Sequence, residues 1–183
     1  MDAKLDGATT IDSSPPLDAG PDSPIVIPGL RVFTSSMTYT GNLGGLAGAD
    51  AKCKLLAQSA GLGSGTWVAW LSTNTTFAKD RITSAGPWTL VGLAGIAVTK
   101  AQLTAPPLGR PLRRNENGQA VNGLVWTGTA PNGTFTDDDC NDWTTEFPFF
   151  HAASGDSLAS GDVWTAATAS DCQTPHRLYC FEL

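Results

Sequence analysis

The densest group of potential oxygen ligands in this chain lies in its second half. Four aspartates and one asparagine fall between positions 137 and 142: Asp137, Asp138, Asp139, Asn141 and Asp142. Calcium takes about six to eight oxygen ligands, mostly carboxylates and carbonyls. Adjacent carboxylates also repel one another unless a cation or hydrogen-bond donors compensate. The four aspartates are therefore candidate calcium ligands, and the alternative is a solvated acidic loop.

The local structure expected around this acidic segment limits such a site. We predict that residues 140–143 form a strand, in which successive side chains point to opposite faces. Asp139 and Asn141 would then share one face, and Asp142 would lie on the other. All five side chains could not converge on one ion.

Aromatic residues suggest a second kind of site. The apolar cluster 147–150 follows the acidic segment, and we take Phe149, Phe150 and Asn141 as candidate ligand-binding residues. The chain also has six tryptophans. Some of them could stack on a sugar, but tryptophans at alternating strand positions are more typical of a core.

A possible hydrolase signature is present at Gly155-Asp156-Ser157-Leu158. In the hydrolase family that carries it, this signature lies near the N-terminus, and its Asp and His partners follow far downstream. Here only residues 159–183 follow, and His176 is the one histidine among them. A triad also needs an oxyanion hole and a positioned acid. We interpret His151 and His176 as ordinary surface or core residues and predict that the chain is not an enzyme.

Cysteines are the remaining reactive groups, and there are four: Cys53, Cys140, Cys172 and Cys180. The sequence has no Cys-x-x-Cys motif and no Cys/His cluster, which argues against zinc. Disulfide bonds formed in an oxidising compartment are the favoured interpretation, and four free thiols in a cytosolic protein are the alternative. Four cysteines allow three pairings, and spacing alone does not choose among them.

Length and composition indicate one globular domain with a tail. The chain has 183 residues, of which 15% are charged, and a net charge of −6. This charge argues against nucleic-acid partners and against anionic membrane surfaces. We predict an acidic, Pro/Asp-rich linker at 1–29 and the domain at 30–183. Because the charged residues Asp2 and Lys4 come so soon after Met1, we expect that Met1 stands in place of a signal sequence.

Periodicity and turn signals predict the elements that position these groups. One amphipathic helix is expected at 46–60, ended by Gly61 in a left-handed cap. The final strand, 177–181, should place Leu178 and Cys180 on one face and Tyr179 and Phe181 on the other. Other strands are expected at 30–37, 66–72, 95–98, 124–126 and 163–165. Short helical turns are expected at 77–82 and 100–103, a hairpin around Asn117-Gly118 and a loop at 154–162.

Four sequence pieces, taken in order, resemble the endostatin-type branch of the C-type-lectin-like fold. They are 48–53, 61–72, 125–133, and 140–143 together with Cys172 and Cys180. The resemblance covers roughly 31–183 and is weakest from about 88 to 121. It implies an α+β domain with one main helix on a twisted mixed sheet, long loops, and two nested disulfides, Cys53–Cys180 and Cys140–Cys172.

Two properties of endostatin do not carry over to this sequence. Its zinc site uses histidines near the N-terminus, where this chain has none. Its heparin binding uses a surface arginine cluster, whereas the domain here has ten Lys/Arg against twelve Asp/Glu. The one basic group, Arg110, Arg113 and Arg114, falls where the resemblance is weakest. The Glu-Pro-Asn motif of sugar-binding C-type lectins is also absent, and Asn141-Asp142 precedes its Trp instead of following one.

The chain is also similar to bacterial endostatin-like surface proteins, many of them lipoproteins and some of them adhesins. The resemblance therefore implies a secreted or surface-tethered module, held at the outer membrane, that binds an extracellular protein or glycan through its loops. We expect no cofactor other than possible calcium, and no insertion of the domain into a membrane. The alternatives are a calcium-dependent carbohydrate-binding lectin and a structural module of a cell-envelope assembly.

Overall fold

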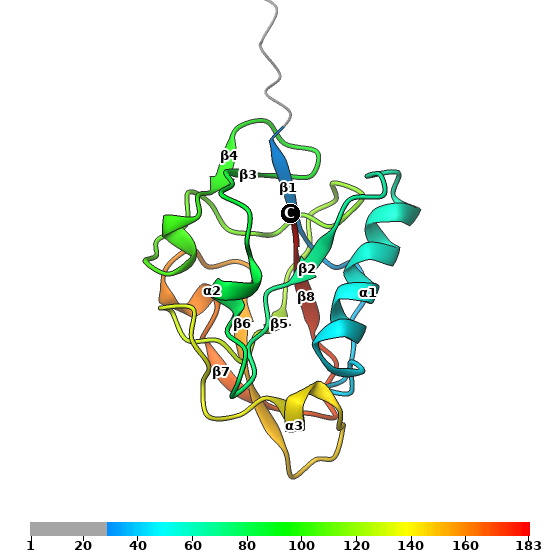
Figure 1. The fold of residues 1–183 in the computed structure, drawn as a ribbon, viewed down its shortest axis with the longest axis vertical. Coiled ribbons are helices and arrows are strands. Elements are labelled where there is room, and N and C mark those ends of the chain that lie inside the picture. The colour runs from blue at the N-terminus through cyan, green and yellow to red at the C-terminus, as the bar shows by residue number, and fades with distance from the viewer. Residues whose placement is uncertain (1–28) are drawn as a thin grey trace, which may run out of the picture.

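The structure is a computed structural model that describes residues 29–183 (Figure 1). The acidic linker predicted at 1–29 lies outside the described residues except for Gly29, and it stays a prediction. Within the described part, no helix is both long and apolar enough to cross a membrane.

The described chain forms an α+β domain with one long helix and eight short strands. The strands are β1 (Leu30–Thr34), β2 (Trp67–Ala69), β3 (Trp88–Leu90), β4 (Ile96–Val98), β5 (Leu124–Trp126), β6 (His151–Asp156), β7 (Thr168–Asp171) and β8 (Arg177–Glu182). The helices are α1 (Gly45–Ser59), α2 (Ala78–Arg81) and α3 (Cys140–Trp143), with single 3₁₀ turns at Ala101–Leu103 and Asp162–Trp164.

Strand β8 lies at the centre of an open, mixed sheet of order β4-β3-β1-β8-β5-β6-β7, and β2 also pairs with β8. It is antiparallel to β1 and β2 and parallel to β5. Both of its faces are buried, as the alternation predicted. Tyr179 and Phe181 belong to one apolar cluster, and Leu178 and Cys180 belong to the other.

Two apolar clusters, one on each face of β8, form the core. One cluster gathers Trp70, Trp88 and Trp164 around Phe181 and Tyr179. The other contains the buried face of α1, with Trp67, Trp126 and Trp143. All six tryptophans are buried, so none of them offers an open sugar-stacking surface.

Helix α1 confirms the predicted amphipathic pattern. Its buried residues Ala49, Cys53 and Ala57 are four apart and small, so the helix packs closely on the sheet. Gly61 has a φ of 71° and ends the helix with two hydrogen bonds, from its own N–H to Gln58 O and from Leu62 N–H to Ala57 O. This is the left-handed cap that the sequence predicted.

Both predicted disulfides are present. Cys53 on α1 is bonded to Cys180 on β8, and Cys140 is bonded to Cys172. In the chain-entropy model, closing loops of 127 and 32 residues contributes about 5 and about 4 kcal/mol respectively. Such bonds are typical of proteins that fold in an oxidising compartment.

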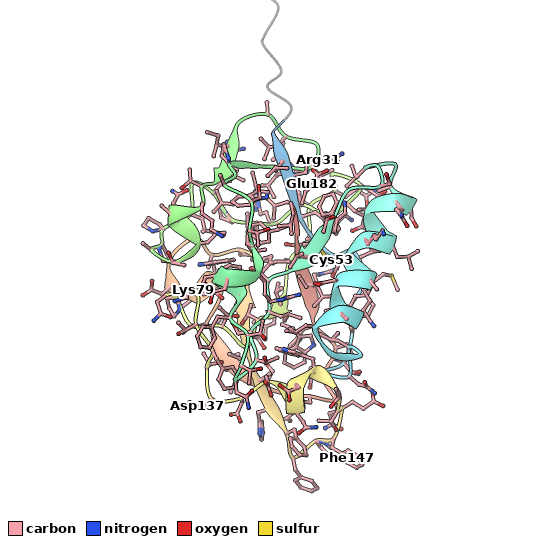
Figure 2. All side chains as sticks on the ribbon, in the orientation of Figure 1. Arg31, Cys53, Lys79, Asp137, Phe147 and Glu182 are labelled. Atoms are coloured by element: carbon pink, nitrogen blue, oxygen red, sulfur yellow. A yellow bond between two sulfur atoms is a disulfide. The ribbon has the colours of Figure 1, made fainter. Side chains whose placement is uncertain are left out.

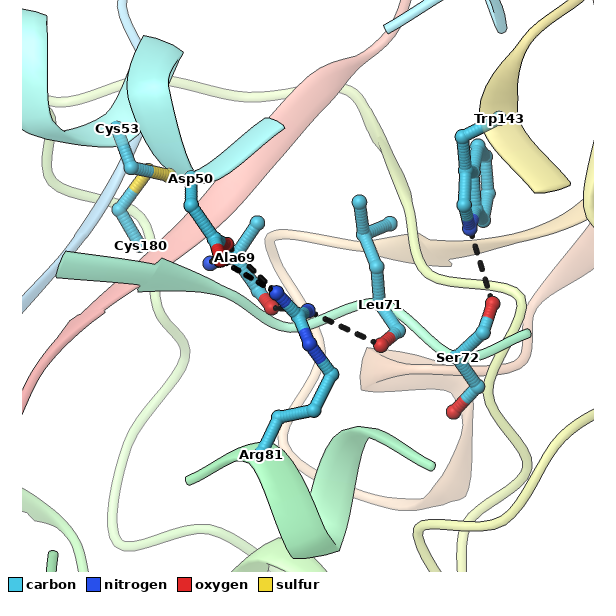
Figure 3. Close-up of polar contacts among 8 residues, drawn as sticks. All are labelled: Asp50, Cys53, Ala69, Leu71, Ser72, Arg81, Trp143 and Cys180. Carbon is cyan, nitrogen blue, oxygen red and sulfur yellow. Dashed lines mark hydrogen bonds and ion pairs between the residues drawn. A yellow bond between two sulfur atoms is a disulfide. The ribbon is translucent and has the colours of Figure 1, made fainter. Parts of the chain in front are cut away.

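A partly buried ion pair joins α1, β2 and α2 (Figure 3). Arg81 Nη2 lies 2.7 Å from both carboxylate oxygens of Asp50. Arg81 Nη1 donates to the carbonyls of Ala69 and Leu71, and Asp50 Oδ1 accepts from Ala69 N–H. The guanidinium therefore satisfies backbone acceptors at the end of β2 and fixes both helices to that strand.

Two predictions that follow residue 150 were wrong. The loop predicted at 154–162 begins inside strand β6, and the strand predicted at 163–165 is a 3₁₀ turn. Gly155 explains the first of these errors. It pairs with Val125 in the sheet, and a Cβ at this position would lie 1.9 Å from Trp164 O. Position 155 must be a glycine because the turn at Asp162–Trp164 crosses directly over it.

Candidate functional site

The acidic segment 137–142 and the aromatic cluster 147–150 lie together at one end of the molecule. Figure 2 shows Asp137 and Phe147 at the end farthest from Arg31 and Glu182. Phe147, Phe149 and Phe150, which we call the aromatic tip, are 66%, 87% and 46% exposed. The described domain exposes eight large hydrophobic side chains. These three phenylalanines lie within four consecutive residues, whereas the other five exposed side chains are more widely spaced along the chain.

Residues 140–143 are not the strand that the sequence predicted but a single left-handed turn, α3. Cys140, Asn141, Asp142 and Trp143 have φ values from 54° to 60°. Left-handed backbone costs L-residues about 1–2 kcal/mol each, with asparagine and aspartate best able to adopt it. The turn is stabilised locally by Asp139, whose Oδ1 accepts from Asp142 N–H at 2.9 Å.

Covalent and packing contacts hold this strained turn in place. Cys140 is bonded to Cys172. The Trp143 indole is buried and donates to Ser72 O at 2.9 Å (Figure 3). Gly41 packs against the disulfide so closely that an added Cβ would lie 2.3 Å from Cys140 Sγ. Residues from three distant parts of the chain thus fix the start of the loop that carries the tip.

The far end of the loop is anchored to β7. Phe150 O accepts from Cys172 N–H at 2.9 Å, and His151 Nε2 lies 2.9 Å from Asp171 Oδ1 on the facing strand. Phe150 N–H donates to Phe147 O at 3.1 Å, which closes a turn at the apex. The tip is therefore exposed, but it stands between two fixed points.

The four candidate calcium ligands do not form one cluster. Asp137, Asp138 and Asp142 are exposed, whereas Asp139 is buried as the cap of α3, and burial raises the pKa of its carboxyl. Within residues 29–183, no three His, Cys, Asp or Glu side chains gather in a way that could hold a metal ion. The geometry gives calcium binding no support, and calcium binding stays a prediction.

The remaining candidates have different surroundings. Asn141 is exposed, and its amide donates to Thr144 Oγ1. Ser157 is fully buried, so its hydroxyl is closed to a substrate in this conformation. His176 is buried against the Trp126 ring, 4.3 Å away, and burial lowers its pKa. His151 is a half-exposed partner of Asp171.

Sequence reasoning missed a cavity elsewhere in the domain. Arg110, Arg113 and Arg114 line a space of about 370 Å³ together with Leu90 and Leu93. The sequence contained part of the signal, because its one basic group, Arg110, Arg113 and Arg114, lies beside Leu108 and Leu112, which are buried.

No protein-family model matches this chain, and a search of curated proteins finds no significant relative.

Proposed function

We propose that this domain is an endostatin-type, C-type-lectin-like binding module of a secreted or surface-tethered protein, and that its aromatic tip captures an extracellular protein. The observation that carries the proposal is the exposure of three phenylalanines on a loop fixed at both ends. Neighbouring exposed aromatics mark interaction surfaces. Aromatic side chains are enriched among the residues that dominate protein–protein binding energy.

The fold supports the first half of the proposal. The structure has the two disulfide pairings, the long helix and the mixed sheet that the resemblance to endostatin implies. Fold likeness alone does not establish function. The tip must therefore carry the binding argument by itself.

The charge around the tip indicates what the partner should look like. Between positions 137 and 150 the chain carries five acidic residues and no basic one. Glu146 adjoins Phe147, and Asp137 lies at the same end of the molecule (Figure 2). An anionic membrane would repel this loop, whereas a protein with an apolar pocket rimmed by lysine or arginine would complement it.

The position of the tip fits a tethered module. The described chain enters the domain at β1, at the end opposite α3 and the tip (Figure 1). A domain held through residues that precede β1 would present the tip away from its attachment. Because the loop is fixed before binding, little ordering entropy has to be lost when a partner docks.

The test is a binding array of purified extracellular matrix proteins, serum proteins and glycans, with and without a chelator. A protein that binds the wild-type domain is then measured against Phe149→Ser/Phe150→Ser. We expect binding to weaken at least about thirtyfold, since even one aromatic anchor of this kind contributes about 2 kcal/mol or more.

Leu55→Ser is the matched control, because Leu55 is 63% exposed on α1. It should leave binding unchanged. A protein partner that binds the tip variant as well as the wild type would refute the tip as the binding surface. Binding restricted to glycans and abolished by the chelator would favour the calcium-dependent lectin instead.

A further inference from the structure

The arginine-lined cavity is a second site, separate from the aromatic tip. Its basic lining is Arg110, Arg113 and Arg114, its apolar wall is Leu90 and Leu93, and none of its lining residues is acidic. Leu90 ends β3, and β3 lies at the opposite end of the molecule from α3 (Figure 1). A ligand bound there would not contact the tip.

The arginines are carried on a fixed backbone. Leu108 and Leu112 are buried in the core, whereas Arg110 and Arg114 are partly exposed and Arg113 is exposed. Arg110 N–H donates to Ala97 O at 3.2 Å, and Arg114 O accepts from Thr34 N–H at 2.8 Å. The segment is thereby tied to β4 on one side and to β1 on the other.

One side chain is also positioned in advance. Arg114 Nη1 donates to Gly118 O at 2.9 Å, so this guanidinium is held while its other N–H groups are free of protein partners among residues 29–183. Gly118 is in the left-handed region, with a φ of 75°, and belongs to the tight turn that follows Asn115. The turn predicted at Asn117-Gly118 thus orients the Arg114 side chain.

The positive charge in the cavity is not neutralised within the described domain. The ion pairs found among residues 29–183 are Arg31–Glu182 and Arg81–Asp50, and neither these nor the contact between His151 and Asp171 involves the cavity. Three like charges around one space repel one another, and a bound anion would relieve that repulsion. The concentration of charge is notable because acidic residues outnumber basic ones in the domain.

We infer that this cavity binds a small anion with two or more negative charges, either a phosphate ester or a polycarboxylate. A guanidinium group can donate two parallel hydrogen bonds to the oxygens of a phosphate or of a carboxylate. Phosphate esters and polycarboxylates therefore offer these arginines the same oxyanion chemistry. A volume of about 370 Å³ fits a small molecule. The wall formed by Leu90 and Leu93 would contact the carbon skeleton of the ligand.

Calorimetry in phosphate-free buffer at low ionic strength tests this, with inorganic phosphate, phenyl phosphate and citrate as probes. We expect phenyl phosphate or citrate to bind more tightly than inorganic phosphate, because only the larger probes reach the leucine wall. Tighter binding of phenyl phosphate would identify the ligand as a phosphate ester, and tighter binding of citrate would identify it as a polycarboxylate. The same ligand should raise the melting temperature, because it binds the native state alone.

Arg113→Gln is the main variant. Arg113 is exposed, and its side chain forms no hydrogen bond or ion pair within residues 29–183, so its loss should not disturb folding. We expect the variant to weaken binding roughly ten- to hundredfold, which corresponds to the loss of a charge-assisted hydrogen bond. Lys54→Gln is the matched control, since it removes one exposed positive charge from α1.

Three results would overturn the inference. One is the absence of both heat and a melting shift with all three probes. Another is equal weakening by Arg113→Gln and Lys54→Gln, which would mean that only net charge matters. The third is binding of a long sulfated polysaccharide with no binding of the small anions, which would make this face a polymer-binding surface and not a small-molecule site.

Discussion

Replacing Arg81 with methionine should destabilise the domain far more than the loss of an exposed charge. Arg81 makes two contacts of 2.7 Å with Asp50 and donates to two backbone carbonyls. Its side chain is 10% exposed, and that of Asp50 is 30% exposed. Methionine fills a similar volume but carries no charge. The fall in the free energy of unfolding therefore reports the lost polar contacts and not a loss of packing.

The expected loss follows from the burial of the pair. Breaking a buried ion pair on one side costs about 3–5 kcal/mol, because the remaining charge is left without its partner. In the variant, the Asp50 carboxylate still accepts the hydrogen bond from Ala69 N–H and is partly exposed to solvent. We therefore expect a loss at the lower end of this range, about 3 kcal/mol. For a domain of this size, that corresponds to a fall in melting temperature of about 6–12 °C.

The assay is urea unfolding followed by tryptophan fluorescence, which the six buried tryptophans make sensitive. Arg113→Met is the matched control, because the same change at an exposed arginine should cost less than about 0.5 kcal/mol. The double variant Asp50→Ala/Arg81→Met should lose less than the sum of the two single losses, since it leaves no stranded carboxylate. A loss below about 1 kcal/mol for Arg81→Met, or strict additivity, would refute the reasoning.

Two further outcomes can be measured on the same material. Cys140→Ser/Cys172→Ser should lose about 2–4 kcal/mol, because about 4 kcal/mol of loop entropy is partly offset when the left-handed turn relaxes. Its tip should also become open to chymotrypsin, and an unchanged urea midpoint with no new cleavage would contradict this. The second outcome concerns His176, whose pKa is lowered by burial. In the unfolded chain the His176 imidazole is protonated at about pH 6.5, whereas in the folded chain it is protonated only at lower pH. The contribution of neutral His176 to the free energy of unfolding is therefore complete above about pH 6.5 and decreases as the pH falls below that value. His176→Gln should flatten the decline in urea midpoint between neutral and mildly acidic pH, and an equally steep decline in the variant would assign the effect to other groups.

Much of the core could be predicted because its signals lie in short stretches of sequence. The alternation of Leu178, Tyr179, Cys180 and Phe181 correctly indicated a strand with two distinct apolar faces. Gly61 correctly marked the end of α1. These signals are local, so they can be read along the chain without knowledge of the contacts.

The parts that failed depend on contacts between distant residues. Asn141 and Asp142 tolerate left-handed backbone, but four such residues in a row persist here only because a disulfide, a buried indole and Gly41 hold them from elsewhere. Strand β6 resembles a loop in the sequence partly because position 155 must be a glycine where Trp164 crosses over it. The arginine cavity likewise forms only when 109–114 meets the end of β3.

The central place of β8 has a consequence for biosynthesis. Strands β1, β2 and β5 all hydrogen-bond to residues 177–182, which are translated after every one of them. Until those residues leave the ribosome, three strands have open edges and Cys53 has no native partner, although Cys140 has already been made. Exposed edges of this kind promote aggregation. The nascent chain must therefore be kept from pairing with its neighbours, and from forming a Cys53–Cys140 bond, until β8 has emerged.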